Sequence, residues 1–263
     1  MVEVAAREVK ALRDATGAGM MDAKRALVAA NGDHEAAAQA LREKGLAKAV
    51  GRSDRDNTEG AIGLATTTDR AAMVHLRCET DFSAKSEGFV SLVDDLASVV
   101  LEEGEGAPEA RAAALDDLRL SIKENVEVGR VALIEAATGN LIDAYLHRQD
   151  GRGVNGVIVE AFGVDQETLH QIALHIAFAK PTALSRDEVP PDLVEVERAA
   201  LLDITKAEGK PEQAWDKIVE GRLSAWFRET VLLEQGLHGD KATVQETLGE
   251  GRIVRFVQAY IGN

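Results

Sequence analysis

Apolar positions at the start of the chain recur at helical spacing and predict three short helices. Two glycines in Thr16-Gly-Ala-Gly19 separate the first helix from the second, and Asn31-Gly32 ends the second because both residues tolerate the left-handed conformation of a helix C-cap. Asp33 is placed to cap the third helix, and Gly45 is expected to close it. The apolar stripes are Ala5, Val9 and Leu12, then Met20, Ala23, Leu27 and Ala30, then Ala37 and Leu41. A core built from about 45 residues is marginal, which favours a docking module at residues 1–50 over an enzyme.

The middle of the chain predicts an α+β fold in which one order of elements occurs twice. Residues 51–60 are polar and flanked by glycines, which indicates a linker. Beyond it, a strand, a turn, a second strand and a helix follow one another, and the series then returns. This predicts two related subdomains, at 61–140 and at 141–189 with 231–263, the second including a C-terminal module. Strands are expected at 61–66, 71–78, 141–147, 154–161 and 252–261, and helices over 89–100, 108–128 and 169–176.

Residues 190–230 have a different pattern, which predicts a protruding hairpin of two amphipathic helices. Gly209-Lys-Pro211 interrupts the helical spacing and marks the turn. The apolar positions are Leu193, Ala200, Ile204 and Ala207 on the first helix, and Trp215, Ile218, Val219, Leu223 and Trp226 on the second.

Charge separates the first module from the rest of the chain. The 263 residues include 45 acidic and 30 basic ones, a net charge of −15. Residues 1–55 carry ten Lys or Arg against eight Asp or Glu, so the remainder of the chain carries −17. An acidic body is repelled by phosphate backbones, and six Phe, two Tyr and two Trp are few for a base-stacking platform. Direct binding to nucleic acid is therefore not expected.

The cysteine content and the lengths of the apolar runs indicate the cellular compartment in which the protein works. The single cysteine, Cys78, leaves no intrachain disulfide and no multi-cysteine zinc site. No run of about 18 apolar residues predicts a transmembrane helix. Met1-Val-Glu-Val lacks the basic and then apolar layout of a signal peptide. The simplest prediction is a cytoplasmic protein that does not contact membranes.

Signatures of enzymes are scarce in this sequence. Residues 151–156, Gly-Arg-Gly-Val-Asn-Gly, fit the spacing of a dinucleotide-binding loop, but they lie in a predicted hairpin turn that runs into a strand. His170 and His175 are five residues apart, a poor fit to a metal pair on one helical face. Cys78 falls on the core face of its predicted strand, where a buried small side chain is favoured over a nucleophile. None of these features is a strong signature of a catalytic, metal or cofactor site.

Three segments carry residues suited to contact with a partner. Thr16–Met21 combines two glycines with two adjacent methionines that cannot both enter one small core, although a plain interhelical turn is the alternative. Cys78–Phe82 presents an acidic and a large apolar residue between strand and helix; alternatively, Asp81 caps the helix and Phe82 packs back on the sheet. Tyr145–His147 ends a strand beside a glycine-rich turn, where a histidine is often merely solvated.

Together these segments give the chain a resemblance to the elongation factor Ts family, the bacterial guanine-nucleotide exchange factors of elongation factor Tu. The resemblance covers nearly the whole chain, and eight segments occur in the order typical of the family. They are Val9–Leu27 with Asn31–Asp33, Cys78–Phe82 with Ala84-Lys85, Glu124-Asn125, Tyr145–His147, Ile172–Ile176 with Pro181, Gly209–Pro211, Lys217–Arg222 and Leu232–Gln235.

The resemblance implies a fold and a set of contact residues. It implies a ubiquitin-associated-like three-helix domain, a core of two related α+β subdomains, an inserted coiled-coil hairpin at 190–230 and a C-terminal module. It further implies a factor without covalent catalysis or cofactor, which binds elongation factor Tu and disturbs that GTPase's Mg²⁺ and phosphate site. The implied intruding residues are Thr80, Asp81 and Phe82, with His147 in the second subdomain's contact and Arg13, Met20, Met21 and Lys24 on the docking surface.

Some positions depart from the family pattern. Ser83 replaces an aliphatic residue, Lys123 replaces a glycine, and Gly129 replaces an arginine. Gly236-Leu237 stands where Pro-Phe is common. These departures leave a second hypothesis open, in which the chain is a binding or scaffold protein for a translational GTPase and does not promote exchange. A third hypothesis, an enzyme using Cys78 and a histidine, is weak.

Overall fold

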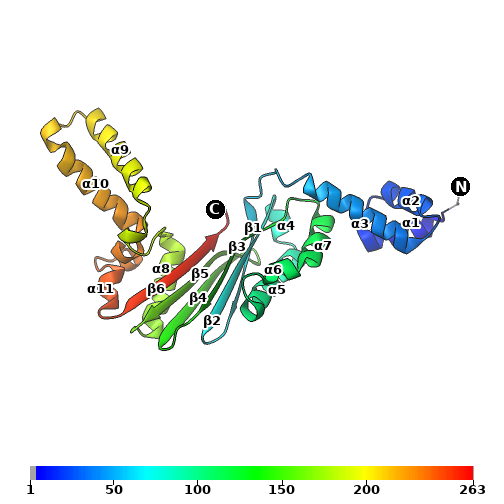
Figure 1. The fold of residues 1–263 in the computed structure, drawn as a ribbon, viewed down its shortest axis with the longest axis horizontal. Helices are drawn as coiled ribbons and strands as arrows, with labels where there is room; N and C mark the ends of the chain where they lie inside the picture. The colour runs from blue at the N-terminus through cyan, green and yellow to red at the C-terminus, as the bar shows by residue number, and fades with distance from the viewer. Residues whose placement is uncertain (1–3, 263) are drawn as a thin grey trace.

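The computed structural model describes residues 4–262 and has an elongated shape built from three parts (Figure 1). A helical module at the N-terminal end leads through one long helix to a central pair of β-sheets, and a helical hairpin projects from the far side (Figure 1). Residues 1–3 of the predicted docking module and residue 263 of the predicted C-terminal module lie outside the described residues.

The N-terminal part contains the three predicted helices, α1 (Ala6–Thr16), α2 (Met20–Ala29) and α3 (His34–Val50). Their small core consists of five buried side chains, Val9, Leu12, Ala23, Leu27 and Ala37. The prediction that Asp33 caps α3 is confirmed, since its carboxylate accepts hydrogen bonds from the amides of Glu35 and Ala36. The likeness to ubiquitin-associated domains stays a prediction.

The prediction that Gly45 closes the third helix is wrong. Helix α3 continues to Val50 because Gly45 faces the neighbouring helix α7 (Ala112–Ile122), where an added Cβ would overlap with the side chain of Leu120. The absence of a side chain therefore serves close helix packing instead of a helix end. As a result, α3 belongs to the N-terminal core at one end and touches the central part of the molecule at the other.

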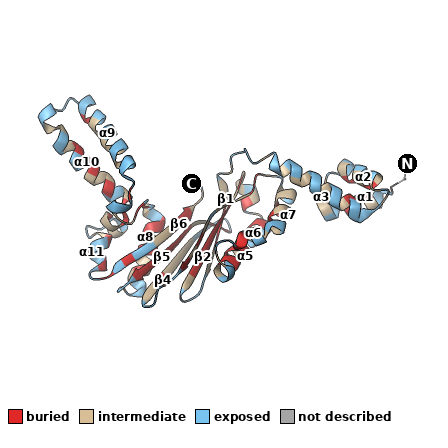
Figure 2. Cartoon of the chain, in the orientation of Figure 1, coloured by how far each residue is buried: buried red, intermediate tan, exposed pale blue. Residues whose placement is uncertain are grey.

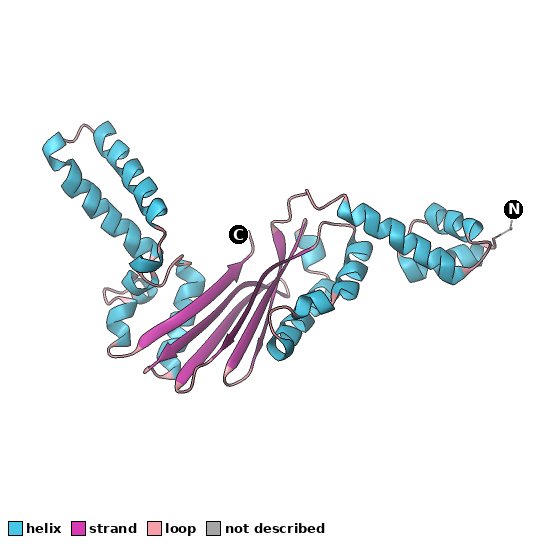
Figure 3. Ribbon diagram, in the orientation of Figure 1, coloured by secondary structure: helices cyan, strands magenta, loops and turns pink. Residues whose placement is uncertain are grey.

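The central part is a sandwich of two three-stranded antiparallel sheets with helices on both outer faces (Figure 3). One sheet has the order β1-β2-β3 and the other β4-β5-β6. The strands are β1 (Glu59–Thr66), β2 (Arg70–Cys78), β3 (Glu127–Glu135), β4 (Asn140–Gln149), β5 (Arg152–Phe162) and β6 (Arg252–Tyr260). Helix α5 (Glu87–Glu103) covers the first sheet and α8 (Gln166–Ala179) the second, and a third apolar cluster fills the space between the sheets.

Glycines in β5 allow the two sheets to approach closely. A Cβ at Gly156 would lie 2.7 Å from Sδ of Met73, and one at Gly153 would overlap with the carbonyl oxygen of Ile62. Both neighbours belong to the opposite sheet, so only glycine fits at these positions. The superficial dinucleotide-like spacing at 151–156 thus reflects sheet packing, as expected from its place in a hairpin.

The helix predicted over 108–128 is wrong at its C-terminal end. The segment forms two helices, α6 (Ala107–Ala110) and α7, and is followed by strand β3, which the sequence analysis missed. Val128 and Ala132 of β3 pair with Leu76 and Met73 of β2, so pairing with a buried strand decides the conformation of this apolar run. With β3 included, each half of the sandwich contains two paired strands, a helix and a third strand.

The hairpin consists of α9 (Pro191–Ala207) and α10 (Trp215–Thr230), and most of α9 is exposed or of intermediate burial (Figure 2). The apolar stripe predicted on α9 faces solvent. Leu193 and Ile204 are about half exposed, and Ala200 and Ala207 are exposed as well. The residues of α9 that are buried or packed against the second helix are instead Val194, Leu201 and Thr205. The remaining short helices are η1 (Arg186–Glu188), η2 (Glu212–Ala214), η3 (Leu232–Glu234), η4 (Leu237–Gly239), α4 (Asp81–Ala84) and α11 (Val244–Leu248).

Candidate functional site

A one-turn helix, α4, directly follows strand β2 and carries the residues singled out at 80–82. Thr80 is its N-cap, because its hydroxyl accepts a hydrogen bond of 3.3 Å from the amide of Ser83. Phe82 is 84% exposed. The alternative in which Asp81 caps the helix and Phe82 packs back on the sheet is therefore wrong. A large apolar side chain held outward on a fixed turn can insert into a partner.

The carboxylate of Glu124 anchors α4 through hydrogen bonds. It accepts hydrogen bonds from the amides of Glu79 and Thr80, both 3.0 Å, and from the hydroxyls of Thr80 and Ser83, both 2.6 Å. Four donors on one carboxylate leave the turn little freedom, since charge-assisted bonds are the stronger ones. Ser83, a departure from the family pattern, therefore adds one hydrogen bond to the anchoring of α4.

One lysine connects helix α4 to the β4–β5 turn. Nζ of Lys85 is 2.8 Å from Asp81 and 3.1 Å from Asp150. The hydrogen bond from Lys85 holds the pKa of Asp81 below its usual range, and the same bond raises the pKa of Lys85. Asp150 and Gly151 form the turn, with φ of 53° and 82°, as a two-residue hairpin loop requires.

His147 lies on β4 near the same turn, with an exposed side chain. Its Nδ1 is 3.2 Å from the hydroxyl of Tyr145. The register of β4 against β5 shifts directly after His147, which is typical of a strand end that redirects side chains. Through Lys85 and Asp150, the structure thus brings this strand end and α4 together at one end of the sandwich.

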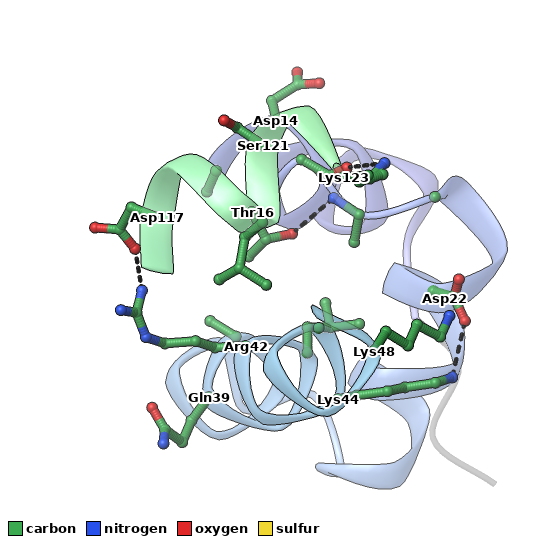
Figure 4. Close-up of a pocket in the computed structure, with 18 of the residues that line it drawn as sticks. Asp14, Thr16, Asp22, Gln39, Arg42, Lys44, Lys48, Asp117, Ser121 and Lys123 are labelled. Atoms are coloured by element: carbon green, nitrogen blue, oxygen red, sulfur yellow. Dashed lines mark hydrogen bonds and ion pairs between the residues drawn. The ribbon is translucent and has the colours of Figure 1, made fainter. Parts of the chain in front are cut away.

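The other predicted contact residues lie on the N-terminal module, away from α4 in the chain. Met20 is 47% and Met21 62% exposed, so neither enters the core, and Arg13 and Lys24 are exposed too. A groove of about 950 Å³ runs between the α1–α2 loop, α3 and α7 (Figure 4). Across it, Lys123 donates a 3.3 Å hydrogen bond to the carbonyl of Gly17, and Arg42 pairs with Asp117 (Figure 4).

Cys78, the candidate nucleophile, is buried and its surroundings favour the neutral thiol. Cys78 is fully buried, as predicted, and its thiol donates to the carbonyl of Thr80 at 3.2 Å. Burial, supported by the nearby charge of Glu124, raises the pKa of Cys78 to about 12. His170 pairs with Asp143, and His175 with Gln235. Among residues 4–262, no three His, Cys, Asp or Glu side chains gather as metal ligands.

Sequence reasoning missed the residues that hold the site in place. Glu124 and Lys85 were noted only as parts of motifs, and Asp150 only as part of the turn between the strands predicted at 141–147 and 154–161. Their roles depend on contacts across 41 to 65 positions of sequence, which periodicity does not reveal. Two departures have local reasons: Gly129 leaves room for the side chain of Arg77, and Gly236 for the backbone of Asp240.

Comparisons with known proteins give one consistent result. Residues 79–263 match the family model described as elongation factor TS. The chain is 42% identical to elongation factor Ts of Cutibacterium acnes, over 98% of this chain and 99% of the relative. It is 41% identical to that of Clavibacter michiganensis, over 89% of each chain, and 38% identical to that of Deinococcus radiodurans, over 97% and 98%. Within the described part of the chain, no helix has the length and apolar character to span a membrane.

Proposed function

Because the chain belongs to the elongation factor Ts family, we propose that its α4 turn is the element that releases GDP from elongation factor Tu. As a member of this family, the protein is a translation elongation factor that acts as a nucleotide exchange factor. The observation that carries the site assignment is the outward Phe82, 84% exposed on a turn with four hydrogen bonds to Glu124.

The mechanism we infer is linkage between two binding equilibria. A GTPase holds its nucleotide through a phosphate-binding loop and a Mg²⁺ ion that bridges phosphate oxygens to the protein. A factor that binds the nucleotide-free state more tightly must weaken nucleotide binding by the same factor. Phe82 would wedge between packed elements of the GTPase, and Asp81 beside it would disturb the Mg²⁺ site. Each 1.4 kcal/mol of such coupling is about tenfold in nucleotide affinity.

Two further surfaces would hold the GTPase during this step. Met20, Met21, Arg13 and Lys24 would dock on its nucleotide domain, and His147 would extend the contact from the second subdomain. Methionines suit such a role because their flexible thioethers adapt to a partner surface. No covalent step and no cofactor of the factor's own are needed, the partner is a protein and not nucleic acid, and the cytoplasm is the place of action.

The test is release of a fluorescent GDP analogue from the host's elongation factor Tu, with the chain at substoichiometric concentration. We expect acceleration with turnover, and a decrease of about tenfold or more with Phe82→Ala, since truncating a buried contact anchor costs about 2 kcal/mol or more. The matched control is Phe162→Ala, another exposed aromatic, at the opposite end of β5 from the β4–β5 turn. Equal rates for Phe82→Ala and the parent chain would refute the wedge, and complex formation without faster release would favour the non-exchanging binder.

A further inference from the structure

Three consecutive residues between α7 and β3 bond the α1–α2 loop, the α4 turn and the connection between α3 and β1. Lys123 donates to the carbonyl of Gly17 in the α1–α2 loop. Glu124 accepts the four hydrogen bonds that hold α4. Asn125, which is buried, donates from its side chain to the carbonyls of Ser53 and Arg55 and from its amide to Glu79, at 3.2, 2.8 and 2.7 Å.

Lys123 occupies a backbone position that favours glycine. Lys123 has φ of 59° and ψ of 31°, the left-handed conformation that favours glycine and costs other residues about 1 kcal/mol. A glycine would end α7 here without strain, as at many helix C-termini. The lysine instead extends to the docking module, where Gly45 of α3 also packs against Leu120 of α7 and Arg42 pairs with Asp117.

We propose that Lys123, Glu124 and Asn125 form a positioning segment that fixes the docking surface of the N-terminal module relative to Phe82. The inference rests on the proposed function, because it concerns how the same site is assembled. In this arrangement Lys123 sets the orientation of the module, Glu124 sets the orientation of α4, and Asn125 holds the connection between α3 and β1. A partner then meets both surfaces already in register, so less conformational entropy is lost when it binds.

The first test separates the two roles by kinetics. Lys123→Gly relieves the backbone strain and removes only the contact with Gly17, so we expect an unchanged maximal rate of GDP release and a half-saturating concentration raised about three- to fivefold. Lys123→Arg should restore the parent value. Glu124→Gln, which leaves fewer acceptor sites for the four donors, should lower the maximal rate about tenfold. Equal half-saturating concentrations for Lys123→Gly and the parent would overturn the role of Lys123, and an unchanged maximal rate for Glu124→Gln would overturn that of Glu124.

The second test measures geometry without the partner. Spin labels on Ala29→Cys of α2 and Glu109→Cys of α6, both exposed positions, report the distance between module and sandwich by pulsed electron resonance, while the buried Cys78 stays unlabelled. We expect one narrow distribution in the parent and in Lys123→Arg, and at least a twofold wider one in Lys123→Gly at a thermal midpoint that is not lowered. A width in Lys123→Gly equal to the parent's would overturn the proposal. If the parent fails to release GDP, the proposed function fails, and this measurement still decides on the positioning.

Discussion

The N-terminal module and the sandwich present apolar contact residues in opposite ways. The module has a core of five buried side chains and exposes two flexible methionines on a regular helix. The sandwich has three apolar clusters and exposes Phe82 on a single turn that is anchored by a carboxylate. Flexible methionines on a small module suit recognition of a partner surface. An aromatic side chain on an anchored turn of a stable sandwich can instead displace packed elements of the partner. Stability should therefore be distributed unequally between the two regions.

The largest expected effect tests that inequality directly. Leu27→Ala in the module and Leu76→Ala in the sandwich each remove a fully buried leucine and should each cost about 3 kcal/mol. In the module this cost exceeds what so small a core supplies, so Leu27→Ala should lose amide-exchange protection across 5–45 only. Leu76→Ala should lower the main thermal transition and leave most protection in place. Equal protection of both regions in Leu27→Ala would contradict the comparison.

Acid should weaken the sandwich before the module. Burial, and to a smaller extent the charge of Arg77, lowers the pKa of His75 to about 4. The unfolded chain takes up this proton below about pH 6.5 while the folded chain does not, so stability falls as pH falls from 6.5 to 4, by up to about 3 kcal/mol. In the module, Arg25 and Lys44 lower the pKa of Asp22 to about 2, well below this window.

The control for the pH dependence is His75→Leu. No hydrogen-bond partner for Nε2 of His75 occurs among the described residues, so replacing this side chain by an apolar one of similar size should change stability at pH 7 by less than about 1 kcal/mol. The free energy of unfolding, measured with urea at pH 7, 6, 5 and 4, should then depend less steeply on pH, by the equivalent of one proton taken up on unfolding. The same slope in the variant and the parent would mean that another group titrates.

The smallest expected effect concerns one helix cap. Asp33→Ala removes the acceptor for two amides at the start of α3 and should cost about 1 kcal/mol of module stability. Thr243→Ala, which removes the cap of α11 beside the sandwich, is the matched change. Amide exchange at the first turn of α3 should rise about fivefold in Asp33→Ala, with no change in α11. In Thr243→Ala, amide exchange should rise in α11 and stay unchanged in α3. Faster exchange in both helices in either variant would show that the two regions are not independent.

The sequence predicted those elements whose conformation depends on residues close together in the chain. It did not predict elements whose conformation depends on contacts between residues far apart in the chain. The Asp33 cap, most of the apolar positions of α1 to α3 and the strands β1, β2, β4, β5 and β6 follow from local pattern. Met20, predicted on the stripe of α2, is exposed instead. Strand β3 and the length of α3 did not follow from local pattern, because Leu76 and Leu120, distant in sequence, determine them. On α9 the predicted stripe was wrong, since Val194 and Leu201 make the packing contacts and leave Leu193 and Ile204 outside.

The candidate site shows the same division. Motif resemblance supplied Thr80, Asp81, Phe82 and His147, and the structure places them at one end of the sandwich. It could not supply the four hydrogen bonds by which the carboxylate of Glu124 anchors the turn that carries Phe82. Nor could it connect Asp81 with Asp150, since both depend on one lysine at position 85.

Helix α3 runs past Gly45 without interruption, so the helix can pivot where Gly45 contacts Leu120. From Gly45 back to the start of α3 at His34 the helix extends about 16 Å, so a rotation of 10° at this contact would displace the module by roughly 3 Å. That displacement equals the length of a hydrogen bond. The angular tolerance of the Gly45–Leu120 contact, together with the contact of Lys123, thus limits how precisely Met20 and Met21 are placed relative to the sandwich.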